Sequence, residues 1–322
     1  MKTLLISLIV AASPALADDL TVYTYDSFAS EWGPGPAIKT GFEAQCSCTV
    51  KFVTAGDGAA LLSRILLEGA GTKADVVIGL DTALTAKARA SGLFQPTTMA
   101  AKPDLPINYS DDTFVPYDWG WFAFVHKAGI DFPTDFKALA DSDLKLVIQD
   151  PRSSTPGLGL LLWVKAAYGD DAKSVWTALA DNIVTVTPGW SEAYTLFLNG
   201  EADAVLSYTT SPAYHLIAEQ DDSKTATEFT EGNYLQIEVA ARLAGTDQPD
   251  LAQAFLDYLV SPAAQAMIPT TNWMYPVTAL PDGLPKGFET LVTPEKSLLM
   301  SPDEAEGARE GALQEWLTAL SR

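Results

Sequence analysis

Short strand-like runs alternate with helix-like segments along most of this chain. The runs hold β-branched and apolar residues and lie at 20–24, 49–53, 74–78, 144–148, 183–186 and 204–207. Segments with helical periodicity follow them, most clearly at 35–44 and 59–68. Because strands that alternate with helices build a sheet covered by helices, the sequence predicts an α/β fold.

The length of the chain predicts two lobes, since 322 residues with 48% hydrophobic content exceed what one core usually holds. The sequence contains no low-complexity linker, so we expect extended crossings between the lobes. The aromatic stretch at 113–125 is the first candidate crossing, and 235–240 is the second. We therefore predict two α/β lobes joined by extended hinge crossings, with approximate bounds of 18–117 and 236–282 for lobe 1 and 118–235 and 283–322 for lobe 2.

The first 17 residues are typical of a secretory signal peptide. Lys2 is followed by an apolar run at 4–10, which is shorter than the roughly 20 residues that cross a bilayer. The small-residue triplet 15–17 then predicts cleavage after Ala17. No cysteine stands at that junction, which argues against a lipid anchor. We expect a periplasmic protein.

The charge balance restricts the partners. The formal net charge is −21, which disfavours nucleic acid and anionic membrane surfaces as binding partners. We expect a monomer.

Cys46 and Cys48 are the only cysteines, and in an exported protein the first expectation is a disulfide that acts as a local clasp. A free thiol pair is the alternative. The only histidines are His126 and His215, so no zinc-type cluster of cysteine and histidine can form. We expect neither a metal nor a cofactor.

Polar residues crowd the junctions between strands and the helices that follow them, at 54–58, 149–156 and 207–212. In open α/β sheets, ligands bind outside the carboxyl ends of the strands, where helix N-termini present free N–H groups. These junctions are therefore candidate binding segments. Helix capping is the alternative role for Thr155-Pro156 and Ser211-Pro212.

Aromatic residues lie in or beside the same junctions, outside periodic core patterns. Their rings offer faces on which flat or cationic solutes can stack, although core packing is the alternative for each ring. The residues are Tyr23, Tyr25, Trp32, Trp190, Tyr208, Tyr214, Trp273 and Tyr275.

Six longer motifs span the chain from end to end: LTVYTYDSF at 20–28, WGPGP at 32–36, DPRSSTPGLG at 150–159, GWSEAY at 189–194, LSYTTSPAY at 206–214 and NWMYP at 272–276. Together they resemble the family of bacterial thiamine-binding periplasmic proteins. The resemblance implies a type II periplasmic-binding-protein fold and a function in binding rather than catalysis. It also implies that the lobes close on thiamine, thiamine monophosphate or thiamine diphosphate and deliver it to the inner-membrane permease of an ABC importer with its ATPase.

The resemblance places the ligand against Tyr25, Asp57, Gly58, Ser154, Thr155, Trp190, Tyr208, Thr209, Thr210, Ser211, Tyr214 and Trp273. Tyr214 and Trp273 are expected to stack on its rings. Hydroxyl and amide donors, with the indole N–H of Trp190, are expected around its tail.

The charged candidates near these motifs leave their roles open. Asp57 or Asp118 is expected to pair with the cationic ring or to accept from the exocyclic amine, and helix capping is the alternative for Asp57. No basic motif resembles a phosphate clamp, apart from Arg152.

Two other functions remain open at this point. A ferric-ion receptor of the same fold would use Tyr208 and Tyr214, with His215 beside them. A thiaminase-like transferase would need a cysteine nucleophile with a nearby base.

Overall fold

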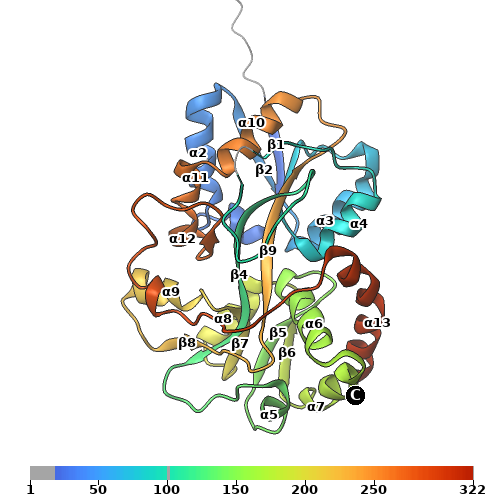
Figure 1. Ribbon diagram of the computed structural model, residues 1–322, viewed down its shortest axis with the longest axis vertical. Helices are drawn as coiled ribbons and strands as arrows, with labels where there is room; N and C mark the ends of the chain where they lie inside the picture. Colours follow the sequence, from blue (N-terminus) through green and yellow to red (C-terminus); the bar gives the residue numbers. More distant parts are fainter. Residues whose placement is uncertain (1–18, 100–101, 322) are drawn as a thin grey trace, which may run out of the picture.

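A computed structural model describes residues 19–99 and 102–321 of the chain. Two α/β lobes lie one above the other in Figure 1 and are connected by the long strands β4 (Val115–Lys127) and β9 (Asn233–Arg242). The α/β prediction is confirmed. The predicted signal peptide lies outside the described residues, within which no helix combines the length and apolar character needed to span a membrane.

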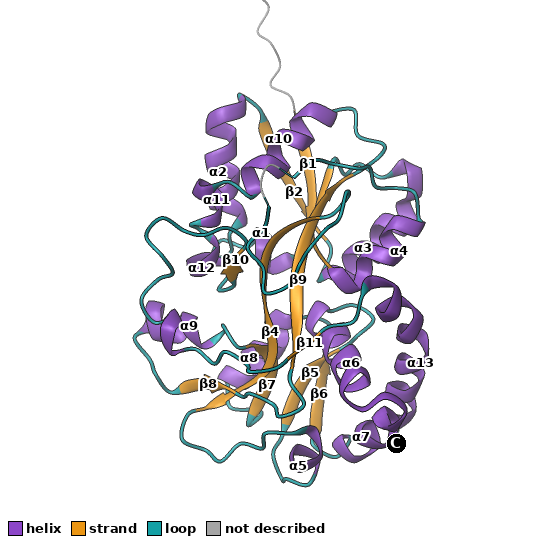
Figure 2. Ribbon diagram, in the orientation of Figure 1, coloured by secondary structure: helices purple, strands orange, loops and turns teal. Residues whose placement is uncertain are grey.

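The upper lobe in Figure 1 carries a sheet in the order β2-β1-β3, continued by β9 and β4. Its strands are β1 (Asp19–Thr24), β2 (Thr49–Thr54), β3 (Val76–Asp81) and β10 (Tyr275–Pro276). Its helices are α1 (Asp26–Ala29), α2 (Gly35–Cys46), α3 (Gly58–Glu68), the 3₁₀ turn Gly69–Gly71, α4 (Thr82–Ala90), α10 (Pro249–Leu259), α11 (Pro262–Gln265) and α12 (Ile268–Thr271). Figure 2 shows the strands along the centre with helices on both sides.

The lower lobe continues the sheet through β4 in the order β4-β7-β5-β6. Its strands are β5 (Leu146–Gln149), β6 (Ile183–Thr187), β7 (Ala204–Tyr208), β8 (Lys224–Ala226) and β11 (Ser297–Leu298). Its helical segments are α5 (Phe136–Ala140), α6 (Thr155–Tyr168), the 3₁₀ turn Gly169–Asp171, α7 (Ala172–Leu179), α8 (Trp190–Leu198), α9 (Pro212–Tyr214), the π-helical turn His215–Glu219 and the 3₁₀ turn Phe288–Thr290. Each strand predicted from the sequence overlaps one of the observed strands.

The strand β4 changes partners halfway along its length. Residues 115–121 pair with β9, and residues 122–126 pair with β7 of the lower lobe. The strand β9 pairs with β4 through 235–240 and with β3 through 238–242. Both predicted crossings therefore fall on strands whose backbone runs without a break from one lobe into the other.

Two features tie distant parts of the chain together. The structure joins Cys46 at the end of α2 to Cys48 before β2 by a disulfide, with Ser47 between them in the left-handed region at φ 53°. The C-terminal helix α13 (Pro302–Leu320) packs on α4 of the upper lobe and on α6 and α7 of the lower lobe.

Candidate functional site

A cavity of about 420 Å³ lies between the lobes, beside the crossing strands. Both lobes supply its walls. Its lining residues are Tyr25, Ser27, Trp32, Asp57, Thr155, Pro156, Trp190, Ser191, Tyr194, Thr195, Leu198, Tyr208, Ser211, Tyr214, Glu238, Thr270, Asn272, Trp273 and Met274.

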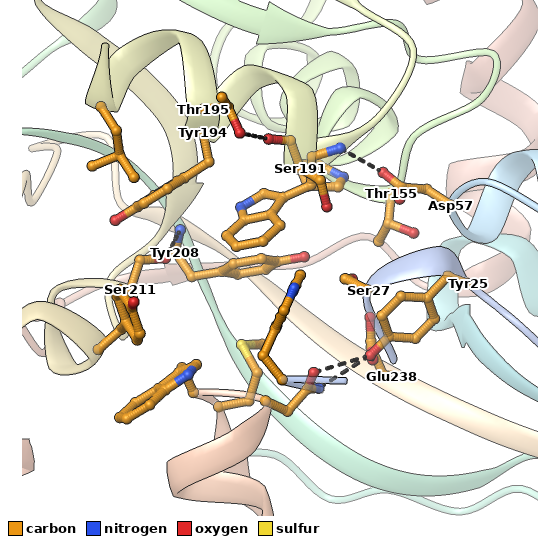
Figure 3. A pocket seen from close by; sticks show the side chains of 18 of the residues that line it. Tyr25, Ser27, Asp57, Thr155, Ser191, Tyr194, Thr195, Tyr208, Ser211 and Glu238 are labelled. Carbon is orange, nitrogen blue, oxygen red and sulfur yellow. Dashed lines mark hydrogen bonds between the residues drawn. The ribbon is translucent and has the colours of Figure 1, made fainter. Parts of the chain in front are cut away.

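Most of the site residues predicted from the sequence meet at this cavity. Tyr25, Asp57, Thr155, Trp190, Tyr208, Ser211, Tyr214 and Trp273 line it. In Figure 3 the Tyr208 ring crosses the centre of the view, between the labelled side chains of Ser211 and Tyr25. The cavity therefore brings together predicted site residues that lie up to 248 positions apart in the sequence, as Tyr25 and Trp273 do.

Four predicted site residues lie behind the lining instead: Gly58, Ser154, Thr209 and Thr210. The N–H of Gly58 donates to Oγ1 of Thr155 at 3.2 Å, and a Cβ on this glycine would lie 2.4 Å from the carbonyl oxygen of Gly79. Thr209 donates its backbone N–H to the Trp121 carbonyl at 2.9 Å. The Thr210 hydroxyl donates to Sδ of Met274 at 3.5 Å. These residues hold the wall in place without reaching the cavity.

Asp57 connects the two lobes across the cavity. It occupies the N-cap position of α3 in the upper lobe, but its side chain makes no capping hydrogen bond. The carboxylate instead accepts from the Ser154 hydroxyl at 2.7 Å and from the Trp190 backbone N–H at 3.1 Å, both in the lower lobe. Burial raises the pKa of Asp57 to about 6, although these two hydrogen bonds act in the opposite direction.

Aromatic rings from both lobes form two groups at the cavity. The Trp190 ring stacks on Tyr194 with 5.0 Å between centroids, and Trp32 from the upper lobe approaches Trp190 at 6.3 Å. The indole N–H of Trp190 donates to the Ser207 hydroxyl at 2.7 Å. That donor is therefore already engaged within the protein, unlike the free donor expected from the sequence.

Tyr214 and Trp273 form the second aromatic group. Their rings meet edge to face with centroids 5.4 Å apart, and both remain partly exposed. Trp273 has φ 57°, a left-handed conformation that is strained for a residue with a bulky side chain. Such strain is frequent at ligand sites, where the surrounding structure fixes the side chain direction.

Glu238 supplies a carboxylate to the cavity that the motif comparison did not include. Its Oε2 accepts from the hydroxyls of Tyr117 and of Tyr25, the latter at 2.9 Å. Asn272 donates to the Tyr25 oxygen at 3.1 Å and to Oδ2 of Asp118 at 2.6 Å. Asp118, expected beside the cationic ring, is completely buried and does not line the cavity.

The sequence carried a signal for Glu238. It is the only charged residue between Asn233 and Ala241, in a strand whose other strongly polar residues are Asn233, Gln236 and the terminal Arg242. A lone acidic residue in a buried crossing strand is unusual and marks a candidate site. Ser27, Ser191, Thr195 and Thr270 lie on the helices α1, α8 and α12 and carried no comparable signal, because hydroxyl residues are common on helix surfaces.

The cavity is acidic and aromatic. Burial raises the pKa of Glu238 to about 7. Of the described residues that line the cavity, none is lysine or arginine. The Arg152 side chain, whose direction the sequence left open, is exposed and forms an ion pair with Asp150. Such a lining suits a flat cation better than an anion.

His215 lies behind the aromatic wall rather than at the cavity. Its Nε2 lies 3.0 Å from the Tyr194 hydroxyl and its Nδ1 lies 2.7 Å from Glu219. Both ring nitrogens are therefore occupied, and the side chain is 1% exposed. The side-chain atoms of His215, Glu219 and Asp221 that could bind a metal ion lie within 4.8 Å of one another, with Glu219 exposed at the surface.

The comparisons with known proteins agree with one another. The model of the family described as "Bacterial extracellular solute-binding protein" matches residues 20–270. The "Thiamine-binding periplasmic protein" of Escherichia coli (strain K12) is 51% identical over 328 residues, covering 100% of both chains. The protein of the same name from Brucella abortus is 50% identical over 98% of this chain and 96% of that one.

Solved structures give the same result. A "Periplasmic thiamin binding protein" has a TM-score of 0.93 at 51% identity, covering 98% of this chain and 100% of that one. Iron-bound HitA from Pseudomonas aeruginosa has a TM-score of 0.74 at 20% identity over 94% and 99% of the two chains, which shows the fold alone. The predicted type II periplasmic-binding-protein fold is confirmed. The chain belongs to the bacterial extracellular solute-binding proteins, and within them to the family of thiamine-binding periplasmic proteins.

Proposed function

We propose that this protein binds thiamine in the interlobe cavity and delivers it to the permease of an ABC importer. One observation carries the proposal: aromatic rings and two carboxylates line the cavity, with no basic side chain among the described lining residues. Thiamine combines a flat aminopyrimidine with a cationic thiazolium, which are the groups that aromatic faces and carboxylates bind. The relatives named for thiamine binding share about half of this sequence.

Eight of the predicted site residues are proposed as ligand contacts. Tyr214 and Trp273 offer one pair of ring faces, and Trp190 and Tyr208 offer another, while Tyr25, Asp57, Thr155 and Ser211 supply polar atoms. The remaining four, Gly58, Ser154, Thr209 and Thr210, are proposed to hold these contacts in position.

Thiamine monophosphate and thiamine diphosphate are proposed as further ligands. The helices α6 and α8 both begin at the cavity, with Thr155 and Trp190 in their first turns. The N–H groups at helix N-termini and neutral hydroxyls, such as that of Ser191, can donate hydrogen bonds to either an alcohol or a phosphate. Asp57 already occupies the backbone N–H of Trp190, so a phosphate would compete with this carboxylate.

The proposed working cycle is a closure of the lobes about β4 and β9, followed by reopening on the permease and its ATPase. We assign 18–117 and 236–282 to one lobe and 118–235 and 283–322 to the other. The mature protein is proposed to be a periplasmic monomer, cleaved after Ala17.

Binding without catalysis is the proposed activity. A thiaminase-like reaction needs a thiol nucleophile at the ligand. Cys46 and Cys48 are joined in a disulfide and neither lines the cavity. Incubating the protein with thiamine and a nucleophilic amine tests this directly, and release of free thiazole would contradict it.

Titration calorimetry with thiamine, together with tryptophan fluorescence, tests the function. We expect one thiamine per chain and a fluorescence change, because Trp190 and Trp273 line the cavity. Ferric citrate is the comparison ligand: a coloured charge-transfer band with iron and no response to thiamine would favour the iron receptor through Tyr208 and Tyr214.

A further inference from the structure

We infer that Glu238 selects the positive charge of the ligand, by holding a proton in the empty protein and releasing it when the cation binds. This inference rests on the proposed function, because it concerns the same cavity. It adds a residue that the sequence motifs did not contain, and it assigns a proton to the binding equilibrium.

Glu238 lies at the base of the cavity on the crossing strand β9. It is 6% exposed, and it is the only member of the β9 strand in the lining. Its Oε2 accepts from the hydroxyls of Tyr25 and Tyr117. Two phenol donors stabilise a negative charge at this position, provided that a positive charge compensates for the lost water.

The neighbouring strands place further acids beside Glu238. The sheet register pairs Glu238 with Asp118 on β4 and with Asp81 on β3. Asp118 is 0% exposed, and its Oδ1 has no hydrogen-bond partner. Asp81 is 4% exposed, and its Oδ1 also has none. Three carboxyl groups therefore lie in one row across the strands that connect the lobes.

The groups facing this row are acidic or neutral. They are the phenols of Tyr25, Tyr117 and Tyr208, the amide of Asn272 and the carboxyl of Asp57. No lysine, arginine or histidine is among the described groups that act on Glu238 or Asp118. Buried carboxyl groups without a cation take up protons rather than remain charged.

Glu238 and Asp118 differ in their access to a ligand. Burial and then the neighbouring Glu238 raise the pKa of Asp118 well above its ordinary value, and Asp118 has one amide donor and no contact with the cavity. Burial raises the pKa of Glu238 to about 7, while its two phenol donors lower it. Asp118 therefore keeps its proton, and Glu238 is the group that a cation in the cavity ionises.

This role makes a prediction about specificity. A cationic ring gains the ionised Glu238 as its partner, and one proton leaves to solvent. A neutral isostere, in which a thiophene replaces the thiazolium, leaves Glu238 protonated and loses that attraction. Since a carboxylate and a cation in a partly desolvated site attract each other strongly, we expect the neutral isostere to bind at least about tenfold more weakly.

Titration calorimetry in pairs of buffers with different heats of ionisation measures the released protons. If the cation lowers the Glu238 pKa by about two units, binding releases roughly 0.8 proton at pH 6, about 0.5 at pH 7 and less than about 0.05 at pH 8.5. The neutral isostere should release close to none, a measurement that needs no variant.

The Glu238→Gln variant tests the assignment to this residue. We expect it to lose most of the proton release and about tenfold in thiamine affinity at pH 8, while Glu192→Gln, on the exposed first turn of α8, keeps both. Asp57→Asn tests whether the released proton comes instead from the other carboxylate that lines the cavity. Thiamine binding with no buffer-dependent heat, or release that persists in Glu238→Gln, would overturn this inference alone. No thiamine binding at all would overturn the proposed function.

Discussion

Replacing Asp57 by alanine removes a carboxylate of the upper lobe that accepts hydrogen bonds from two groups of the lower lobe. Its partners are the Ser154 hydroxyl at 2.7 Å and the Trp190 backbone N–H at 3.1 Å. Neither bond can form when the lobes are apart. The variant should therefore weaken closure, and with it the affinity for a ligand that binds the closed form.

Two opposing effects set the size of this loss. Hydrogen bonds to a charged group contribute about 1.5–3 kcal/mol each. The pKa of Asp57, about 6 against an ordinary 3.8, already includes these two hydrogen bonds, so burial of the charge outweighs the extra strength that the charge gives them. The bridge is therefore worth about as much as two neutral hydrogen bonds, about 1–3 kcal/mol in total.

Asp57→Ala should thus bind thiamine about 5- to 150-fold more weakly at pH 8. Asp57→Asn keeps an acceptor and avoids the buried charge, so its affinity should stay within a few-fold of wild type. Glu192→Gln is the matched control, because it removes a nearby charge without touching the bridge. Calorimetry gives the affinities, and small-angle scattering reports closure. Unchanged affinity in Asp57→Ala, or affinity in Asp57→Asn as low as in Asp57→Ala, would show that the two hydrogen bonds of Asp57 do not stabilise the closed form.

Three further outcomes are expected. Trp273→Ala should weaken thiamine binding by about 0.5–2 kcal/mol through loss of a ring face, and Tyr214→Ala should act similarly; equal affinities would exclude stacking there. Trp273→Gly should lose the same affinity yet melt higher than Trp273→Ala, by about 1 kcal/mol in stability, because glycine accepts φ 57° without strain. The pKa of Glu238 is higher in the folded protein than in the unfolded chain, so its stabilising effect is full below about pH 4.5 and is lost as pH rises through 7. The free energy of unfolding of wild type relative to Glu238→Gln should therefore fall by about 3 kcal/mol between pH 4 and 8. Chemical denaturation measures this difference, and a difference that stays constant with pH would contradict the prediction.

Much of the fold could be predicted from local patterns. Strand-length apolar runs and helical periodicity located β1, α2, β2 and α3 within a few residues, because these elements bury one face against a single sheet. The change of partners along β4 could not be predicted, since pairing with β9 or with β7 depends on residues 78 or more positions away.

The site was only partly accessible from the sequence. Motifs identified Tyr25, Trp190 and Trp273, which line the cavity, but motifs cannot separate a lining residue from one that supports it. Ser154 illustrates this, because its hydroxyl is directed to Asp57 rather than to the cavity. Glu238 carried a signal as the lone acid of its strand, but only the sheet register sets it between the acids of two neighbouring strands.

The proposed site holds thiamine in the interlobe cavity, between aromatic rings and beside Glu238. A crystal structure of the mature protein grown with thiamine, accompanied by calorimetry on the same sample, tests it most directly. We expect one thiamine per chain, its rings against Trp190 or Trp273 and its thiazolium facing Glu238. Thiamine bound elsewhere on the chain, or a cavity that remains empty at saturating thiamine, would contradict it.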